Sequence, residues 1–426
     1  MKIKKILKRL LQLHPKSVDL SLHRIKRLLK ELKNPEKKIT NVIQVIGTNG
    51  KFSVCTSLRE IFETAGYSVN MNISPSLRKF NERYYFAGKY ISDEKLHDLL
   101  IEVEKINKNQ NITFHEFICA CFFLAASRKK SDVTILEAGL FFRLDASNVL
   151  KKNIASIIMP IGIDHKDFLK KGTIDEIIYE KCSHLLNNSK IIISQQKKDV
   201  LINIKKNIYK NTSKKIFFGK DYNYKKNVDG FTYMDKKGKI NLPSPNLLGD
   251  FQLSNISTAI NTVRNLSQFE ITETDIKKSI TKIRSEGRLQ IINEGKLRKL
   301  VSKRNKILID GAHNPLAASV VKEYLKKFNN DNKIIMILGM MANKEHKKFI
   351  KFFKNIVHSI VTLDIPNQTN FIKKEELSQI AKSFGIVSKT ESSIKLALKN
   401  ISKENDDAII FCTGSLYFAG EILNLN

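Results

Sequence analysis

Apolar runs and amphipathic segments alternate along the first half of the chain. Five short apolar runs are predicted to be buried strands, and they are residues 41–46, 131–139, 154–162, 190–194 and 215–219. Strands that are apolar throughout are typical of parallel sheets, because both of their faces are buried. The segments between several of these runs have helical periodicity, so the pattern predicts an α/β fold with a mainly parallel sheet.

The pattern changes near residue 200 and restarts near residue 294. Residues 200–245 are rich in Lys, Asn and Gly and contain short β-like pieces, which indicates a β-rich, hairpin-bearing elaboration of the first domain. Beyond it, the runs NKILIDGAHNP, KIIMILGM, HSIVTLDIP and DAIIFCTGS predict further strands that end in polar or glycine-rich loops. We therefore expect two domains, residues 1–290 and a smaller, Rossmann-like α/β domain over residues 294–426.

The positive charge of the chain raises the question of a nucleic-acid partner. Lys and Arg number 74 against 42 Asp and Glu, which gives a net charge of +32. Phosphate backbones attract such charge, but these lysines are spread over the whole chain, without an aromatic-interleaved basic motif. Compositional bias explains this spread better, so we expect no nucleic-acid partner, and a basic cleft for anionic small molecules fits the same composition.

The N-terminus and the cysteines indicate a cytoplasmic protein. The first residues, MKIKKILKRLLQLHPKSVDL, are basic and amphipathic, and lysines interrupt their apolar residues before a signal-peptide core or a membrane span can form. The cysteines Cys55, Cys119, Cys121, Cys182 and Cys412 are odd in number and lack metal-knuckle or redox spacing. Reduced thiols and no membrane contact are the expected state.

A candidate phosphate-binding loop, GTNGKFS, occupies residues 47–53. Gly47, Gly50 and Lys51 follow a predicted strand and precede a helical pattern, which is the context of a P-loop-type ATPase domain. Its glycines would let backbone N–H groups approach phosphates, and its lysine would reach the β- and γ-phosphates. The usual pattern has glycine in place of Val45 and Ser or Thr in place of Phe52, so a glycine turn that caps a helix beside a solvated lysine is the alternative interpretation.

Ten motifs follow one another in an order that resembles folylpolyglutamate synthase/dihydrofolate synthase, a family of the Mur ligase superfamily. They are GTNGK, SPSLRKFNERYYFAGKYISDEKL, TFHEF, LEAGLFFRLDASNV, IGIDHKDFL, EKCSHL, LLGDFQLSN, EGRLQ, DGAHNP and CTGSLYFAGE. The resemblance implies an ATP-dependent ligase that phosphorylates a carboxylate and joins the acyl phosphate to the α-amine of L-glutamate. The implied acceptors are 7,8-dihydropteroate, which yields dihydrofolate, and tetrahydrofolate, which takes further glutamates; residues 1–290 would bind ATP and residues 294–426 would form the glutamate-ligase domain.

The resemblance also assigns nucleotide-binding and catalytic residues. The implied nucleotide contacts are Gly47, Thr48, Asn49, Gly50, Lys51, Phe52, Ser53, Asn255, Arg288 and Asp310. Lys51 would neutralise phosphate oxygens, and His313 matches a histidine that faces the phosphates. Lys181 occupies the place of a lysine that is carbamylated in the family, although its neighbours depart from the usual EKAGI. An ordinary lysine on the surface of a helix is the alternative interpretation of Lys181.

Magnesium is the metal that the resemblance implies, with one or two ions bound and K⁺ as a further candidate. Ser74 and Glu137 match one set of metal ligands, and His165 of the DH motif matches the ligand of a second metal. Considered singly, Glu137 and His165 would more often be ordinary loop residues. Together these residues offer hard oxygen ligands and one imidazole, which suits such a metal.

The acceptor pocket is where the sequence departs from the family. The resemblance assigns the acceptor to two motifs, Thr113, Phe114, His115 and Glu116, and Arg143, Leu144, Asp145 and Ala146. Phe141 and Phe142 replace paired glycines, Ser76 replaces a histidine and His115 replaces a phenylalanine. Bulky residues adopt left-handed backbone only with strain, so we expect a rebuilt loop or a reshaped pocket.

Two alternatives to the folate ligase stay open. One is a Mur-type ligase with a different carboxylate acceptor, which the four replaced positions motivate. The other is a degenerate ligase fold kept as a binding protein, but that reading predicts loss of charged residues that this sequence retains, among them Lys51, Glu137 and His165. We expect a monomer that acts on small-molecule substrates.

Overall fold

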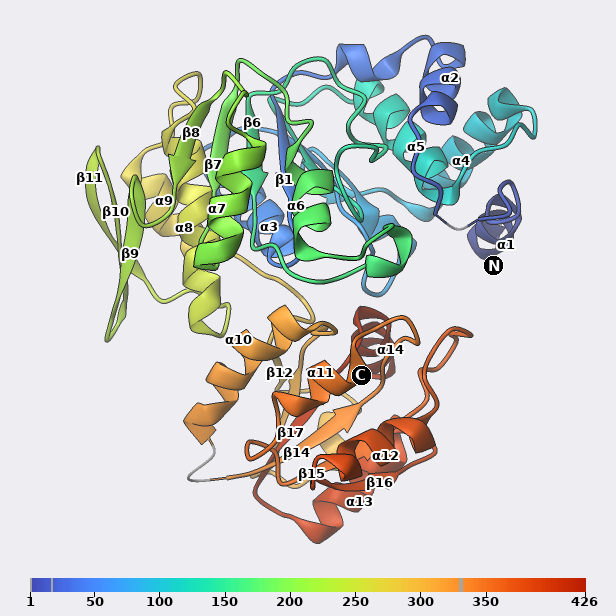
Figure 1. The fold of residues 1–426 in the computed structure, drawn as a ribbon, viewed down its shortest axis with the longest axis vertical. Helices are drawn as coiled ribbons and strands as arrows, with labels where there is room; N and C mark the ends of the chain where they lie inside the picture. Colours follow the sequence, from blue (N-terminus) through green and yellow to red (C-terminus); the bar gives the residue numbers. More distant parts are fainter. Residues whose placement is uncertain (1, 17, 329–331) are drawn as a thin grey trace. The chain divides into compact units, whose positions relative to one another are not determined.

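The computed structural model describes residues 2–16, 18–328 and 332–426, and the chain divides into two compact units. The N-terminal unit comprises Met1–Ile161, Phe168–Asn246 and Leu253–Arg284. The C-terminal unit comprises Ser285–Asn426 and two short segments that lie earlier in the sequence, Gly162–Asp167 and Leu247–Gln252. Figure 1 follows the chain through its helices and strands.

An eight-stranded sheet forms the centre of the N-terminal unit. Its strands, in spatial order, are β4 (Lys89–Tyr90), β3 (Tyr84–Phe86), β2 (Val69–Asn72), β5 (Val133–Glu137), β1 (Val42–Ile46), β6 (Ala155–Ile158), β7 (Lys190–Ile193) and β8 (Lys214–Phe217). Neighbours from β2 to β8 are parallel, and β3 and β4 add antiparallel partners at one edge. The predicted α/β fold with a mainly parallel sheet is confirmed.

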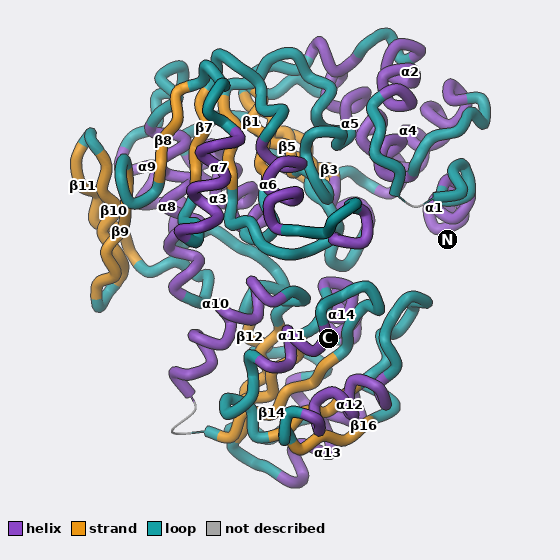
Figure 2. The backbone as a smooth tube through the Cα atoms, in the orientation of Figure 1, coloured by secondary structure: helices purple, strands orange, loops and turns teal. Residues whose placement is uncertain are grey.

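The centre of this sheet is apolar because its strands are covered on both faces. All five residues of β1, VIQVI, are buried between β5 and β6. Figure 2 shows α6 (Ile174–Cys182) and α7 (Lys198–Asn207) against one face, and α3 (Lys51–Thr64) and α8 (Asp250–Arg264) against the other. The remaining helices of the unit are α1 (Lys2–Leu10), α2 (His23–Glu31), α4 (Asp93–Asn107), α5 (Phe114–Arg128) and α9 (Glu273–Ile280).

The β-rich elaboration contains a separate antiparallel sheet. Strands β9 (Tyr222–Asn227), β10 (Gly230–Asp235) and β11 (Gly238–Pro243) pair in the order β11-β10-β9. The elaboration begins later than residue 200, because α7 continues to Asn207. Val200 and Ile204 lie one helical turn apart and are both buried, which explains why this lysine-rich stretch is a helix.

A six-stranded sheet organises the C-terminal unit. Its order is β12 (Gln290–Ile292), β13 (Lys306–Ile309), β17 (Ala408–Thr413), β14 (Lys333–Leu338), β15 (Ser359–Thr362) and β16 (Val387–Thr390). All its neighbours are parallel except the β12–β13 pair. The helices are α10 (Pro315–Leu325), α11 (His346–Lys351), α12 (Lys374–Ser383), α13 (Ile394–Glu404) and α14 (Leu416–Leu425). A second, smaller α/β sheet was predicted and is present.

Two further expectations concern membranes and thiols. Among the described residues, none of the helices combines the length and the apolar content that a membrane crossing needs. All five cysteines are buried and unbridged. Burial raises the pKa of the Cys182 thiol to about 12 and likewise raises that of Cys412 to about 12, so these thiols stay protonated at neutral pH.

Candidate active site

Strand register brings three predicted site elements to one edge of the main sheet. Val45 of β1 is level with Glu137 of β5, and Asn72 of β2 is level with Leu136. The loop after β1, the last residue of β5 and Ser74 after β2 therefore follow neighbouring strands at their carboxyl ends. Ligands bind at this edge in parallel α/β sheets.

The loop over residues 47–50 requires its two glycines. Gly47 has φ 147° and Gly50 has φ 81°, in the region that side chains disfavour. A Cβ at Gly47 would lie 2.7 Å from Cβ of Met159, and a Cβ at Gly50 would lie 2.8 Å from Oδ1 of Asn255. Asn255, a predicted nucleotide contact, thus lies directly against the loop.

The segment after β6 and the start of helix α3 both fix the loop. The carbonyl of Pro160 accepts hydrogen bonds from the N–H groups of Thr48 (2.9 Å) and Asn49 (3.2 Å). Helix α3 begins at Lys51, and its N-cap is Gly50, without a side-chain cap. The first turn of a helix presents N–H groups and the positive end of the helix dipole, so this N-terminus suits an anion.

Lys51 is folded back over the loop. Its Nζ donates to the carbonyls of Gly47 and Thr48, both at 3.3 Å, and lies 3.8 Å from Oε1 of Glu137. The side chain is only 12 % exposed, so the alternative of a solvated lysine is wrong. The ammonium group is held beside a helix N-terminus, where it can meet phosphate oxygens.

Ser74 and Glu137 lie together at the same edge. The N–H of Ser74 donates to Oε2 of Glu137 at 3.1 Å, and the Ser74 hydroxyl accepts from Nη1 of Arg83 at 3.2 Å. A carboxylate and a hydroxyl are the hard oxygen donors that magnesium prefers, so the pair fits such a metal. Within the described part of the chain, no three His, Cys, Asp or Glu side chains form a metal-holding group. His165 belongs to the C-terminal unit.

Lys181 is buried, so the interpretation as a surface helix lysine is wrong. The residue is 4 % exposed, near the end of α6. Its Nζ donates to the carbonyl of Gly47 at 3.0 Å and to the carbonyl of Leu140, and it lies 5.5 Å from the ring centroid of Phe141. Lys181 and Lys51 thus share the carbonyl of Gly47, which places Lys181 under the candidate phosphate loop.

Phe141 and Phe142 are core residues with ordinary backbone. Both are buried, at 1 % and 0 % exposure, and neither is among the described residues with positive φ. The N–H groups of Phe142 and Arg143 both donate to the carbonyl of Glu180, at 3.0 and 2.8 Å. The loop therefore carries both phenylalanines without left-handed backbone, and the two rings pack in the interior. A rebuilt loop or a reshaped pocket stays a prediction.

We expect Phe142→Ala to lower the free energy of unfolding by about 3–5 kcal/mol, because it removes a fully buried ring and leaves a cavity. Urea denaturation followed by circular dichroism measures the change. Val228→Ala, at a position that is 98 % exposed, is the matched control and should have no measurable effect. A loss below about 1 kcal/mol in Phe142→Ala would show that the ring is not part of the packed core.

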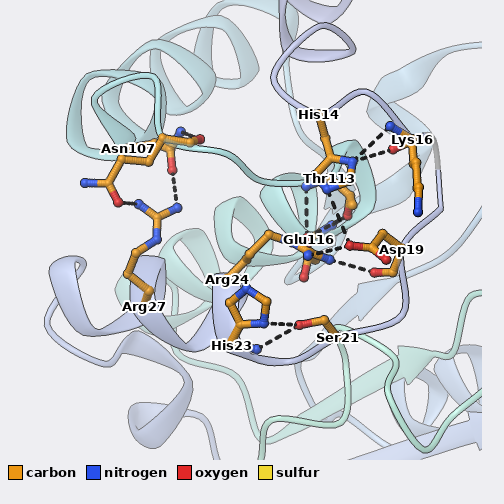
Figure 3. A network of polar contacts seen from close by, with 11 residues as sticks. His14, Lys16, Asp19, Ser21, His23, Arg24, Arg27, Asn107, Thr113 and Glu116 are labelled. Atoms are coloured by element: carbon orange, nitrogen blue, oxygen red, sulfur yellow. Dashed lines mark hydrogen bonds and ion pairs between the residues drawn. The ribbon is translucent and has the colours of Figure 1, made fainter.

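The first acceptor motif is engaged in an internal polar network (Figure 3). Thr113 is the N-cap of α5 and forms a capping box with Glu116. Arg24 donates through Nε to Oε2 of Glu116 at 2.9 Å and through Nη1 to Oδ2 of Asp19 at 2.6 Å. Thr113 and Glu116 are each 3 % exposed, so their side chains serve this internal network. Phe114 and His115 are only partly buried.

Asp145 and His115 form a pair in which the aspartate is fully occupied. Oδ2 of Asp145 accepts from the N–H of Gly139 at 3.0 Å, and Oδ1 accepts from the N–H and hydroxyl of Ser147 at 2.9 and 2.6 Å. Nε2 of His115 lies 3.4 Å from Oδ2, and the His115 side chain is 31 % exposed. Burial lowers the pKa of His115, but Cys119 and Asp145 outweigh burial and raise it well above 6.5. His115 therefore presents the accessible side of this pair.

The remaining residues of the second acceptor motif are partly accessible. Arg143 forms an ion pair with Glu180, with Nη2 at 2.8 Å from Oε1, and its side chain is 28 % exposed. Leu144 is partly buried, and Ala146 is buried at 2 % exposure. This part of the motif thus combines one partly exposed cation, Arg143, with apolar neighbours.

In the C-terminal unit, Asp310 fixes the loop after β13. Its carboxylate accepts from the N–H groups of Leu289 (2.8 Å) and Ala312 (2.7 Å). Burial raises the pKa of Asp310 above 3.8, while Arg288 and these two N–H groups oppose the rise. Arg288 crosses close to Gly311, where a Cβ would lie 2.8 Å from Nη1. Asp310 and Arg288 are therefore neighbours, and their contacts with a nucleotide stay predictions.

His313 and His165 converge on a residue that the sequence did not single out, Asp164. Nε2 of His313 lies 3.3 Å from Oδ2 of Asp164, and Nδ1 lies 2.8 Å from the carbonyl of Gly311. The N–H of His165 donates to Oδ1 of Asp164 at 2.9 Å. Burial would raise the pKa of Asp164, but His313, His165 and Lys344 hold it well below 3.8. The DH motif could have pointed to Asp164 as a site residue. No sequence motif pointed to Lys344.

Comparison with known proteins identifies relatives of both units. The family "Mur ligase middle domain" matches residues 45–263, and "Dihydrofolate synthetase, C-terminal domain" matches residues 292–425. The dihydrofolate synthase/folylpolyglutamate synthase of Buchnera aphidicola subsp. Acyrthosiphon pisum is 31 % identical over 408 residues, which cover 93 % of each chain.

Solved structures have the same fold. The structure of E. coli FolC in complex with DHPP and ADP superposes with a TM-score of 0.87 at 23 % identity, over 99 % of this chain and 97 % of that chain. A bifunctional folylpolyglutamate synthase/dihydrofolate synthase from Yersinia pestis, complexed with AMPPNP and Mn ion, superposes with a TM-score of 0.86 at 21 % identity, over 99 % and 97 % of the two chains.

Proposed function

Because the chain belongs to the dihydrofolate synthase/folylpolyglutamate synthase family of Mur ligases, we propose that it is an ATP-dependent ligase that joins L-glutamate to a pterin carboxylate. The proposed acceptors are 7,8-dihydropteroate and, for further glutamates, tetrahydrofolate. The acceptor carboxylate attacks the γ-phosphorus of ATP and releases ADP. The amine of glutamate then attacks the acyl phosphate, forms the amide and releases phosphate.

One observation carries the proposal: a loop lysine at a helix N-terminus lies beside a carboxylate at the carboxyl edge of the sheet. Lys51 Nζ is 3.8 Å from Glu137, and Glu137 accepts from the N–H of Ser74. Phosphoryl transfer needs a cation on the phosphate oxygens and a metal beside them. Lys51 supplies the first, and Ser74 and Glu137 are suited to hold the second.

The metal requirement follows from the donor chemistry and from the relatives. Ser74 and Glu137 would hold Mg²⁺, which would neutralise charge on the phosphates when bound. The relative from Yersinia pestis contains Mn ion, which supports the use of a divalent metal by this chain. The assignment of His165 to a second metal and the use of K⁺ remain predictions, as does carbamylation of Lys181.

The remaining nucleotide contacts are proposed residue by residue. Gly50, Phe52 and Ser53 would contribute the loop and first turn of α3, and Asn255 lies against Gly50. In the C-terminal unit, Arg288 would bind an anion through its guanidinium, Asp310 would contact the nucleotide, and His313 would face the phosphates. The two units would then serve ATP binding and glutamate ligation, respectively.

A second candidate function is a ligase with a different carboxylate acceptor. The observation that favours it is the His115–Asp145 pair, in which Gly139, Ser147 and His115 occupy both oxygens of Asp145. Asp145 then has little hydrogen-bonding capacity left for an acceptor substrate. The accessible imidazole of His115 would contact that substrate instead. An acceptor that bonds to an imidazole would suit this pocket better than one that bonds to a carboxylate.

Release of ADP from ATP decides between these functions. The assay contains glutamate, magnesium and bicarbonate, with either 7,8-dihydropteroate or tetrahydrofolate as acceptor, at matched enzyme concentration. Turnover with either acceptor is the expected result. ATP binding without turnover with both would exclude the folate acceptors and support the second function, and failure to bind ATP would support a binding protein without ligase activity.

We expect Phe52→Gly to retain ATP-dependent ligation. Phe52 is in the first turn of α3, where no positive φ is required. Ser74 and Glu137 would hold the metal that a hydroxyl at this position would otherwise bind. The cost of glycine in a helix, about 0.5–1 kcal/mol, should affect stability more than turnover. A large loss of ATP affinity, measured by calorimetry, would show instead that Phe52 is a required packing element.

The broader expectations also remain predictions. We propose a monomer that works in the cytoplasm on small molecules and binds neither membrane nor nucleic acid. Sedimentation in solution would test the first point. Binding to random-sequence DNA that disappears with added salt would contradict the last.

A further inference from the structure

Residues 162–167 form a segment that leaves one unit and packs in the other. Strand β6 before it and helix α6 after it belong to the N-terminal unit, but the segment itself belongs to the C-terminal unit. Gly162 is pressed against α10, where a Cβ would lie 2.9 Å from Cδ2 of Leu316. Lys166 forms an ion pair with Glu345 at the other end of the segment. We call residues 162–167 the strap.

Asp164 is the polar centre of the strap. Oδ1 of Asp164 accepts from Nζ of Lys344 at 2.6 Å, and Oδ2 accepts from Nδ2 of Asn314 at 3.0 Å. The N–H of His165 bonds to Oδ1, and His313 lies beside Oδ2. The carboxylate therefore ties together three stretches of the chain that are far apart in sequence.

The pair of Asp164 and Lys344 is buried, which distinguishes it from the surface ion pairs nearby. Their side chains are 7 % and 8 % exposed. By comparison, Lys348 pairs with Glu345 while 68 % exposed. Removing one partner of a buried pair leaves the other charge without compensation, whereas loss of an exposed pair has little effect. Of the cationic or imidazole side chains at Asp164, Lys344 makes the shortest contact, at 2.6 Å against 3.3 Å for His313 and 3.8 Å for His165.

We propose that Lys344 is a positioning residue: it anchors the strap through Asp164 and so fixes the orientation of His165 and His313. The proposal rests on the proposed function, because there His165 is a metal ligand and His313 faces the phosphates. Asp164 bonds directly to the backbone of His165 and lies 3.3 Å from Nε2 of His313, so a shift of its carboxylate moves both. Partners behind metal ligands typically change affinity or activity by about 10- to 100-fold when removed.

Hydrogen exchange in the protein without substrates tests the anchor. In Lys344→Met we expect amide exchange across residues 162–168 to rise by about tenfold, with unchanged protection in β14 and β17. Lys348→Met is the control, because it removes an exposed lysine close by in the same unit. Lys344→Gln, which keeps a neutral donor, replaces the methionine variant if that variant does not fold. Unchanged exchange in the folded variant would overturn the proposal.

Kinetics separates positioning from a purely structural role. In Lys344→Met we expect kcat to fall by about tenfold or more and the half-saturating Mg²⁺ concentration to rise, with partial recovery in Lys344→Arg. Faster exchange with unchanged kcat and Mg²⁺ dependence would assign Lys344 a structural role only and overturn the proposal. If wild-type protein turns over neither acceptor, the proposed function fails. The affinity of the ATP-loaded protein for Mn²⁺, measured by electron paramagnetic resonance, then decides whether Lys344 acts on metal binding.

Discussion

Replacing Lys51 by methionine is expected to lower the rate of ADP release by about 10³-fold at saturating substrates. The ammonium group is only 12 % exposed and is held beside the N-terminus of α3, so its charge acts in a site where water screens it weakly. Methionine keeps the length of the side chain and removes the charge. The two carbonyls that Lys51 contacts, both at 3.3 Å, lose only long hydrogen bonds, so the fold should remain intact.

Lys198→Met provides the control for Lys51→Met. Lys198 is the first residue of α7, as Lys51 is the first residue of α3, but Lys198 is exposed. Its loss should leave turnover unchanged. If Lys51→Met keeps more than about a tenth of wild-type turnover, this lysine does not stabilise the charge that develops on the phosphates.

Lys181→Met is expected to lower turnover by about 100-fold and to reduce stability by about 1–3 kcal/mol, because two carbonyls lose their bond from Lys181 and one of them keeps only the long bond from Lys51. The carbonyls are those of Gly47, in the phosphate loop, and Leu140, beside the two phenylalanines. Loss of this double anchor loosens the loop that carries Lys51. ADP release and urea denaturation measure the two effects, and the exposed Lys151→Met is the control.

The same variant bears on carbamylation. The ammonium form of Lys181 donates to two carbonyl oxygens, and an anionic carbamate would be repelled by them. A carbamate keeps a single N–H on Nζ, so carbamylated Lys181 can donate to at most one of the two carbonyls. A carbon-13 carbamate signal in bicarbonate that is present in wild type and absent from Lys181→Met would establish the modification, and wild-type activity that does not depend on bicarbonate would argue against it.

Much of the fold could be predicted from apolar runs, because central parallel strands are buried on both faces. Strands β1, β5, β6 and β7 lie in four of the five runs singled out in the sequence, and β8 begins one residue before the fifth. Strand β2, VNMN, was missed because two asparagines occupy buried positions and break the apolar run. The edge strands β12 and β16 were also missed, since they are short and partly exposed.

The site was predictable where chemistry is local and unpredictable where it depends on tertiary contacts. The loop around Lys51 has a spacing that can be recognised in sequence. The burial of Lys181 could not be seen, because in sequence it resembles any basic residue on an amphipathic helix. The same is true of Lys344, which stands among lysines and is set apart only by its contact with Asp164.

The backbone conformation of the phenylalanine pair depends on tertiary packing, which the sequence does not display. Left-handed backbone would be strained at these residues, but Phe141 and Phe142 have negative φ and pack in the interior. Bulky residues can be accommodated at such positions when the backbone has an ordinary, negative φ. The buried rings then contribute packing. Because both rings are buried, contacts with the acceptor would come from neighbouring side chains, above all His115.

The strap also limits where the protein can be truncated or divided into fragments. A fragment that starts at Ser285 would contain Lys344, Asn314 and His313 but would lack Asp164 and the other residues of Gly162–Asp167 and Leu247–Gln252. Its buried lysine would have no carboxylate, and the surface that Gly162 covers on α10 would face water. Truncations and chimeras of this ligase should therefore exchange the strap together with the C-terminal half, because the two units are not separate cassettes in the coding sequence.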